Sequence, residues 1–193
     1  MNNLPKAVFL MGNRNAGKSV IAKYLEDTHH FTARGFADPL YEQLAILNPW
    51  IHTGVSITKA QHEQYRALVW RFGVDYVKRN FVEVRKWLQL LGTECGRDIH
   101  GQDCWVKIAE ERSRGDYRTA FYDTRFANEV AWGRSLDSLF IYVWSDRETP
   151  QSDHRSEMQL DYWAEGDYTI ENNGSLQELY DKVEDVLHQW ANS

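Results

Sequence analysis

The sequence predicts an α/β fold in which helices flank a mainly parallel sheet. The first observation is an apolar run at residues 7–11, which a glycine-rich turn and then helical periodicity follow. The second is that short apolar runs return at residues 119–122, 139–143 and 168–170, with helical stretches between them. Strands that alternate with helices favour parallel pairing, because each crossover helix packs on a face of the sheet.

The elements follow in chain order. Residues 7–11 are apolar throughout, which is typical of a strand buried on both faces, and Gly12 closes this run. Val20, Tyr24 and Leu25 then predict a helix over residues 18–27. Near the end of the chain, a Ser175-x-x-Glu178 capping box predicts the start of a helix. Its apolar stripe is formed by Leu176, Leu179, Tyr180, Val183, Val186, Leu187 and Trp190.

The middle of the chain, from about residue 39 to residue 114, shows little strand signal. Val82, Val84, Leu88 and Leu91 recur with helical periodicity, and residues 48–58 are predicted to form a loop. No Gly/Ser linker or low-complexity tract separates this region from the rest. We therefore predict a helical insert that is a subdomain of one folded unit.

The composition is that of an ordinary globular domain. The chain has 193 residues, of which 42% are hydrophobic and 26% charged, which excludes disorder, collagen and coiled coil. The net charge of −6 argues against a protein that grips nucleic acid. Two cysteines fit a reducing compartment. Because we find no signal peptide and no long apolar run, we predict a cytoplasmic protein with no membrane partner.

A phosphate-binding loop is the strongest motif. Residues 12–19 satisfy G-x-x-x-x-G-K-[ST] between the predicted strand and helix, the context this motif requires. Glycines allow backbone N–H groups to point inward, and the helix N-terminus favours negative charge. The residues predicted to bind a nucleoside triphosphate are Gly12, Asn13, Arg14, Asn15, Ala16, Gly17, Lys18 and Ser19.

Within this loop, Lys18 is predicted to reach the β- and γ-phosphates, and Ser19 to ligate Mg²⁺. Asp123 follows the strand at 119–122 and is a second candidate magnesium ligand, unless it begins the next turn or caps the next helix. Arg125 projects from the same edge, either as the ion-pair partner of that carboxylate or as a contact to an acceptor phosphate.

An acceptor that is itself an anion needs arginines. Arg97 lies in a predicted flexible loop over residues 92–98, flanked by glycines, and is a candidate. Arg147 and Arg155 belong to a polar segment at 145–165 that we predict to close over the phosphates, the alternative being an acidic surface loop. For Asp38, an N-cap followed by proline is the structural alternative to a ligand role.

Other nucleotide and hydrolase motifs are missing from the sequence. No Asn-Lys-x-Asp is present to recognise guanine, and the Asp98-Ile99-His100-Gly101 match to D-x-x-G follows no apolar strand. The segment that begins at His62-Glu63 lacks the second histidine of a zinc protease, and no G-x-S-x-G occurs.

Several blocks together carry a family resemblance. They are G-N-R-N-A-G-K-S at 12–19, F-A-D-P-L at 36–40, L-G-T-E-C-G-R-D at 91–98, W-V at 105–106, D-T-R-F-A-N-E at 123–129 and H-R-S-E at 154–157. With these blocks in this order, the chain resembles the bacteriophage deoxynucleoside monophosphate kinases over nearly its whole length.

The resemblance implies a P-loop NTPase fold: a parallel five-stranded sheet core at about 1–36, 115–144 and 166–193, a helical monophosphate-binding insert at 37–114, and a lid at 145–165. It also implies ATP as donor, a deoxynucleoside monophosphate as acceptor, and a homodimer. The resemblance puts the P-loop residues on the ATP phosphates and Asp123 on the metal side. From the chemistry of the transfer, we predict catalytic roles for Lys18, Arg125, Arg147 and Arg155. Its acceptor-side positions are Asp38, Glu94, Arg97, Trp105, Arg125 and Glu129.

Two alternatives stay open from the sequence. Residues 48–64 and the abundance of tryptophan do not match the family pattern, and the 123–125 block is also similar to animal-type phosphomevalonate kinases. The second alternative is a regulatory P-loop ATPase without a small acceptor. The sequence does not assign the base of the acceptor or its sugar.

Overall fold

The computed structural model describes residues 3–55, 60–146 and 164–193. These residues divide into two compact units, one formed by Met1–Phe36 with Val106–Ser193 and the other by Ala37–Trp105. We call them the first unit and the second unit. The second unit is thus an insertion in the chain of the first, and it ends nearer to the N-terminus than the predicted insert at 37–114.

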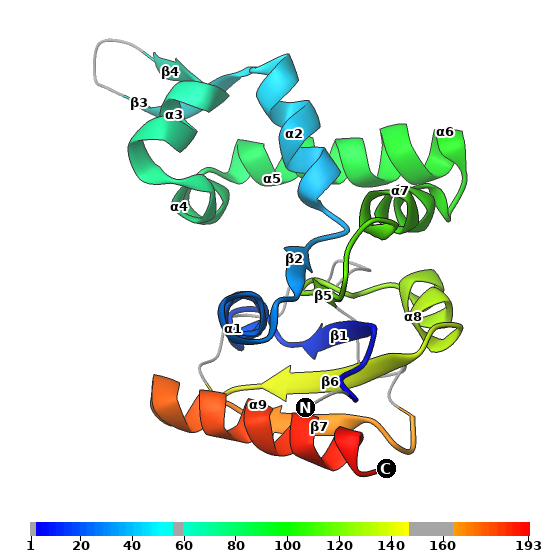
Figure 1. The fold of residues 1–193 in the computed structure, drawn as a ribbon. Helices are drawn as coiled ribbons and strands as arrows, with labels where there is room; N and C mark the ends of the chain where they lie inside the picture. The colour runs from blue at the N-terminus through cyan, green and yellow to red at the C-terminus, as the bar shows by residue number, and fades with distance from the viewer. Residues whose placement is uncertain (1–2, 56–59, 147–163) are drawn as a thin grey trace. The chain divides into compact units, whose positions relative to one another are not determined.

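A parallel five-stranded sheet forms the centre of the first unit (Figure 1). Its strands are β1 (Ala7–Gly12), β2 (Thr32–Arg34), β5 (Thr119–Phe121), β6 (Ser138–Trp144) and β7 (Tyr168–Glu171). They lie in the order β2-β5-β1-β6-β7, and every neighbouring pair is parallel. All residues of β1 are buried, as the apolar run predicts. The predicted α/β class with a parallel five-stranded sheet is confirmed.

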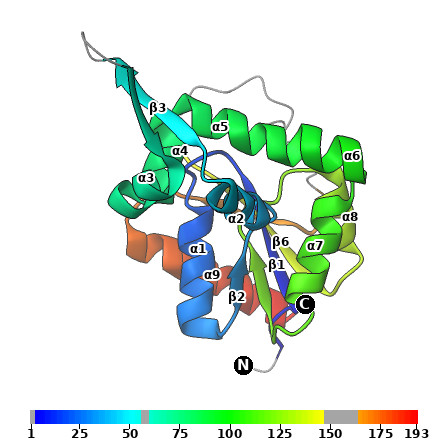
Figure 2. The ribbon, with the colours of Figure 1, turned by 90° about the horizontal axis from the view of Figure 1, so that it is seen from above.

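Helices cover both faces of this sheet. Helices α1 (Lys18–His29) and α9 (Leu176–Ala191) lie on one side, where Ile21, Leu25 and Val183 pack in one cluster with β-strand residues such as Val8 and Leu139 (Figure 2). On the other side lie α7 (Cys104–Ser113) and α8 (Ala127–Arg134). The two clusters together form the core of the first unit.

The face of the sheet that α7 and α8 cover is rich in aromatic side chains. The ring of Phe9 stacks between those of Phe121 and Phe140, with ring centroids 4.9 Å away on each side. Trp132 of α8 meets Phe9 edge-on at 5.7 Å. Such ring pairs add about 1 kcal/mol each to the burial of their apolar area.

The chain connections after the adjacent strands β1 and β5 indicate where a ligand binds. After β1 the chain enters α1 on one face, whereas after the adjacent β5 it enters α8 on the opposite face. Strand order therefore reverses between β1 and β5. In open α/β sheets, ligands bind outside the carboxyl ends of the strands at this kind of reversal.

The second unit has its own core, in which Leu44, Ile51, Tyr65, Leu68 and Val84 are buried. Its helices are α2 (Asp38–Leu47), α3 (Tyr65–Phe72), α4 (Val74–Asn80), α5 (Val82–Gln89), α6 (Asp98–His100) and the π-helix η1 (Leu90–Arg97). Its strands are β3 (Trp50–Val55) and β4 (Ala60–Gln64), which pair antiparallel as a hairpin.

Three local expectations for this unit are wrong. The predicted loop at 48–58 contains β3, so the insert is not wholly helical. The predicted flexible loop at 92–98 is helical, because η1 runs directly between α5 and α6. At α2, Asp38 is the first helical residue and Ala37 the N-cap, so the predicted cap is one residue displaced.

The C-terminal helix is confirmed with its cap. The hydroxyl oxygen of Ser175 accepts a hydrogen bond from the backbone N–H of Glu178 at 3.3 Å. Leu179, Val183, Val186 and Leu187 are buried as predicted, whereas Leu176 in the first turn is exposed. Among the described residues, no helix is both long and apolar enough to cross a bilayer.

Candidate active site

The P-loop joins β1 to α1 through backbone that few residue types tolerate. Gly12 and Gly17 have φ angles of 120° and 103°, and Asn15 has a φ of 60°. These are left-handed conformations, which glycine adopts at no steric cost and asparagine tolerates. At Gly12 a Cβ atom would also overlap the carbonyl oxygen of Val143 on β6. The motif glycines are therefore needed for the loop's path between the strand and the helix.

Lys18 is folded back onto the loop. Its Nζ donates hydrogen bonds of 2.6 Å to the carbonyl oxygens of Gly12 and Asn13, and the side chain is buried, with 8% exposed. The ammonium group is therefore held at the mouth of the loop by neutral carbonyls, which a more strongly charged phosphate oxygen can replace.

The N-terminus of α1 completes the anion site. The N-cap residue Gly17 has no side chain that could bind the first N–H groups of α1, and the first turn contains no acidic residue. Its N–H groups and the positive end of the helix dipole therefore face no negative side chain of that turn. Ser19, in the same turn, is exposed. This arrangement favours a polyphosphate over a neutral ligand.

Asp123 lies two residues beyond β5. Its Oδ1 accepts a hydrogen bond of 2.7 Å from the backbone N–H of Phe36, which follows β2. One carboxylate oxygen thus helps to hold the neighbouring β2 connection at the carboxyl edge of the sheet. Its predicted position is what the structure has, while its predicted role as a metal ligand stays a prediction.

The residues after Asp123 form a tight entry into α8. Glu129 is buried, and its Oε2 accepts hydrogen bonds from the backbone N–H groups of Arg125 at 2.7 Å and Phe126 at 3.0 Å. Glu129 therefore fixes the backbone that carries Arg125. The two roles predicted for Arg125, ion-pair partner of Asp123 or contact to an acceptor phosphate, both stay predictions.

Thr124, between these two residues, is fully buried. Its Oγ1 has no hydrogen-bond partner among the described residues. A buried hydroxyl without a partner costs about 1 to 3 kcal/mol, and such atoms are rare in folded proteins. No feature of the sequence distinguishes it from an ordinary strand-end threonine.

The other acceptor-side candidates, Asp38, Glu94, Arg97 and Trp105, lie in the second unit. Glu94 and Arg97 are both on η1. π-Helices are rare in proteins, and those that do occur are often found at functional sites. Glu94 is exposed and Arg97 is buried, with Nη1 donating a 2.8 Å hydrogen bond to the carbonyl of Gln102. Arg97 is thus more firmly held than a flexible loop would allow.

Trp105 packs against the same π-helix. Its Nε1 donates a 2.8 Å hydrogen bond to the carbonyl of Gly92, and a Cβ on Gly96 would overlap its ring. Gly96 of the L-G-T-E-C-G-R block therefore makes room for the tryptophan ring. Next to it, burial raises the pKa of the Cys104 thiol, as expected of an unreactive cysteine.

Arg147 and Arg155 lie outside the described residues, as does most of the predicted lid at 145–165. Within the described residues, no cluster of three His, Cys, Asp or Glu side chains could hold a metal. A nucleotide-bound Mg²⁺ needs fewer protein ligands, because it retains waters and binds phosphates. Ser19 and Asp123 offer the hydroxyl and carboxylate oxygens that this cation prefers.

Asn172 is a residue of the site that the sequence analysis missed. It directly follows β7, and its side-chain Nδ2 donates a 2.8 Å hydrogen bond to the carbonyl of Ala16 in the P-loop. The signal that selects Asp123, a polar residue at the carboxyl end of a parallel strand, applies equally to Asn172.

The sheet, the loop between β1 and α1 and the buried lysine define a P-loop nucleotide-binding protein of the α/β class. The sequence model of the family described as deoxynucleotide monophosphate kinase matches residues 74–183, more than half of the chain. The chain belongs to this family, which confirms the resemblance to the phage kinases.

Individual proteins that are similar to this chain carry the same family name. A deoxynucleotide monophosphate kinase of Escherichia phage RB69 is 32% identical over 110 residues, covering 54% of this chain and 44% of that protein. The deoxynucleoside-5'-monophosphate kinase of Escherichia phage T5 is 26% identical, with coverage of 78% and 83%. For a putative deoxynucleotide monophosphate kinase of Acanthamoeba polyphaga mimivirus the identity is 28% and the coverage 90% and 92%. The chain thus spans less than half of the RB69 relative's length.

Proposed function

We propose that this protein transfers the γ-phosphoryl group of ATP to the 5′-phosphate of a deoxynucleoside monophosphate, giving a deoxynucleoside diphosphate and ADP. The observation that carries the proposal is the P-loop with Lys18 held at its mouth, in a chain that belongs to the deoxynucleotide monophosphate kinase family. The names of the phage relatives support the acceptor class.

On the donor side, the N-terminus of α1 and Lys18 bind the β- and γ-phosphates. Lys18 exchanges the carbonyl oxygens of Gly12 and Asn13 for phosphate oxygens and neutralises charge on the transferred group. Ser19 and Asp123 would hold Mg²⁺, which when bound neutralises phosphate charge. Since most of this stabilisation is electrostatic, the loop does its work by being preorganised.

On the acceptor side, a phosphate oxygen of the monophosphate attacks the γ-phosphorus in line, and the bond from that phosphorus to the bridging oxygen of ADP breaks. The acceptor needs no general base, because a phosphate monoester with a second pKa of about 6 is already mostly dianionic at neutral pH. We assign the binding of the acceptor to Asp38, Glu94, Arg97, Trp105, Arg125 and Glu129. Arg147 and Arg155 we assign to charge compensation on the transferred group.

For its partners, we propose a cytoplasmic homodimer that binds neither nucleic acid nor membrane. The acidic net charge of −6 supports the absence of a nucleic-acid partner. Sedimentation of the purified chain tests whether it forms a dimer, and a DNA-binding assay at low salt tests whether it binds nucleic acid.

The experiment that tests the function is ADP formation from ATP and Mg²⁺ with each common deoxynucleoside and ribonucleoside monophosphate, and with phosphomevalonate. We expect turnover that depends on a deoxynucleoside monophosphate. Stimulation by phosphomevalonate alone, or ADP release that no acceptor changes, would instead support the other kinase or the regulatory ATPase.

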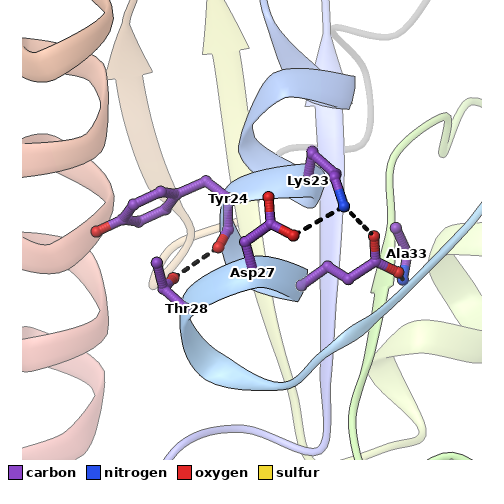
Figure 3. A network of polar contacts seen from close by, with 6 residues as sticks. Lys23, Tyr24, Asp27, Thr28 and Ala33 are labelled. Carbon is purple, nitrogen blue, oxygen red and sulfur yellow. Dashed lines mark hydrogen bonds and ion pairs between the residues drawn. The ribbon is translucent and has the colours of Figure 1, made fainter.

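The matched variants are Lys18→Ala and Lys23→Ala. Lys23 is on the same helix, but it is exposed and forms surface ion pairs with Asp27 at 2.8 Å (Figure 3) and with Glu26 at 3.0 Å. Both variants remove one lysine from α1. We expect Lys18→Ala to lower kcat about a hundredfold or more. Lys23→Ala should retain normal turnover, and equal effects of the two changes would contradict the assignment.

A further inference from the structure

The side chain of Asn172 connects the end of β7 to the P-loop, although the two are far apart in sequence. It is buried, with 8% exposed, and its Nδ2 lies 2.8 Å from the carbonyl oxygen of Ala16. Because a carbonyl oxygen can only accept, the amide nitrogen is the donor. The mechanism above does not use this contact.

This hydrogen bond fixes the orientation of a whole peptide group. The described chain contains no cis peptide bond, so the C=O of Ala16 and the N–H of Gly17 point in opposite directions in one plane. Asn172 holds the C=O toward the protein interior. The N–H of Gly17, the N-cap residue of α1, is therefore directed outward, to the side from which a phosphate reaches the loop.

The approach of Asn172 requires the motif glycine. A Cβ on Gly17 would lie 2.5 Å from Asn172 Nδ2 and 3.6 Å from a methyl carbon of Leu179. Gly17 thus serves a second purpose besides its left-handed φ: it leaves space for the asparagine amide beneath the loop.

The backbone around Asn172 is itself fixed. Its N–H donates to the carbonyl of Trp144 at 2.8 Å, beside the β6–β7 pairing. The next residue, Asn173, accepts a hydrogen bond from the N–H of Asp146 at 2.8 Å and donates to Glu171 Oε1 at 2.8 Å. The Asn172 side chain is therefore presented from a braced strand end rather than from a flexible loop.

We propose that Asn172 is a positioning residue for phosphate binding: it holds the Ala16–Gly17 peptide so that the Gly17 N–H is preorganised for the phosphates of the donor. The inference rests on the proposed function only for the identity of the donor, since it concerns a polyphosphate anion of any source. It adds to the P-loop a residue that lies 156 positions beyond Ala16, outside the motif.

The test compares Asn172→Leu, which has no donor, and Asn172→Asp, which presents only acceptor oxygens at neutral pH, with a matched control. In the control, Asn192→Leu, the lost bond is of the same kind, from an asparagine Nδ2 to the carbonyl of His188 at 2.7 Å, at the exposed end of α9. Inorganic tripolyphosphate and MgATP are titrated by calorimetry well below the melting temperature of each variant. Initial rates then give KM separately for ATP and for the acceptor.

We expect both Asn172 variants to bind tripolyphosphate and MgATP about tenfold more weakly, with Asp the weaker of the two. The KM for ATP should rise while that for the acceptor stays unchanged, and Asn192→Leu should match the wild type. Variants that melt earlier but bind tripolyphosphate with unchanged affinity when folded would show that the bond only stabilises the fold, and would overturn the proposal. Tripolyphosphate binding does not depend on phosphoryl transfer, so a failure of the proposed function gives a different result.

Discussion

Among single residues, Thr124 has a buried hydroxyl whose Oγ1 finds no hydrogen-bond partner in the part of the chain that the structure describes. Thr124→Val keeps the shape of the side chain and removes the polar atom. We expect this change to raise the free energy of unfolding by about 1 kcal/mol, because an unsatisfied group is replaced by a methyl group. Urea denaturation measures it. A destabilised variant would mean that the hydroxyl binds an ordered water or a ligand atom in solution.

The Asp116 carboxyl should make the stability of the fold depend on pH in the acid range. Hydrogen bonding to Arg34, which reaches Asp116 Oδ1 at 2.7 Å, lowers the pKa of this carboxyl below its usual 3.8, although burial acts in the opposite direction. A carboxylate with a lowered folded-state pKa stabilises the fold above its unfolded-state pKa. That contribution is present above pH 3.8 and is lost as the pH falls through the folded-state value.

The variant Asp116→Asn removes this contribution. At neutral pH we expect it to lower the free energy of unfolding by about 1 to 2 kcal/mol, and below pH 3.8 the difference from the wild type should shrink. Urea denaturation at a series of pH values tests this. A difference that stays constant into the acid range would show that the charge of Asp116 does not stabilise the fold.

At the scale of elements, the turn from β1 into the P-loop depends on Gly12. Alanine there would adopt an unfavourable φ of 120°, and its Cβ would overlap the carbonyl of Val143 on the paired strand β6. We expect Gly12→Ala to lower the free energy of unfolding by about 3 kcal/mol or more and to abolish ATP binding. The control is Gly115→Ala, where a Cβ meets no atom within 4 Å. Thermal melting and ATP titration of both variants decide it, and a stable Gly12→Ala that binds ATP would disprove the steric argument.

The elements that sequence patterns predicted are those whose residues specify them locally. Strand β1 is apolar along its whole length, and Ser175 with Glu178 marks the start of α9, so both were placed within a residue. Strand β2 was missed because it has only three residues, Thr32–Arg34, and its pairing with β5 determines it. The β3–β4 hairpin was missed because β4, with the sequence A-Q-H-E-Q, has no run of apolar residues.

Some residues of the candidate site could also be predicted from local sequence, and others could not. The P-loop could be predicted from its motif, because glycine positions and a lysine are sufficient to define it. Residues 92–98 were predicted to be a loop, because their glycines are typical of loops, whereas in the structure Gly96 provides space for the ring of Trp105. Asn172 could not be connected to Ala16 from the sequence, since only the folded sheet brings the end of β7 to that carbonyl.

At the scale of the whole molecule, the two units raise the question of whether they unfold separately. The second unit is a continuous segment, Ala37–Trp105, whose buried core is small and which leaves large apolar side chains such as Ile46, Trp50 and Trp70 exposed. Segments of this size are marginally stable when they fold alone. The first unit is discontinuous, so its two parts are joined through the second. We therefore predict one cooperative unfolding transition for the full chain, in line with a single domain.

Binding of ATP tests whether the two units unfold together. A ligand that binds only the folded protein stabilises it by about 2.7 kcal/mol at a hundred times its Kd. We expect calorimetry to show a single transition, with calorimetric and van't Hoff enthalpies equal, that moves as a whole to higher temperature with MgATP. Hydrogen exchange should then slow in peptides from residues 60–105 as well as from residues 3–36, even though the P-loop belongs to the first unit alone. Two transitions, of which MgATP moves only one, would show instead that the second unit is an independent domain.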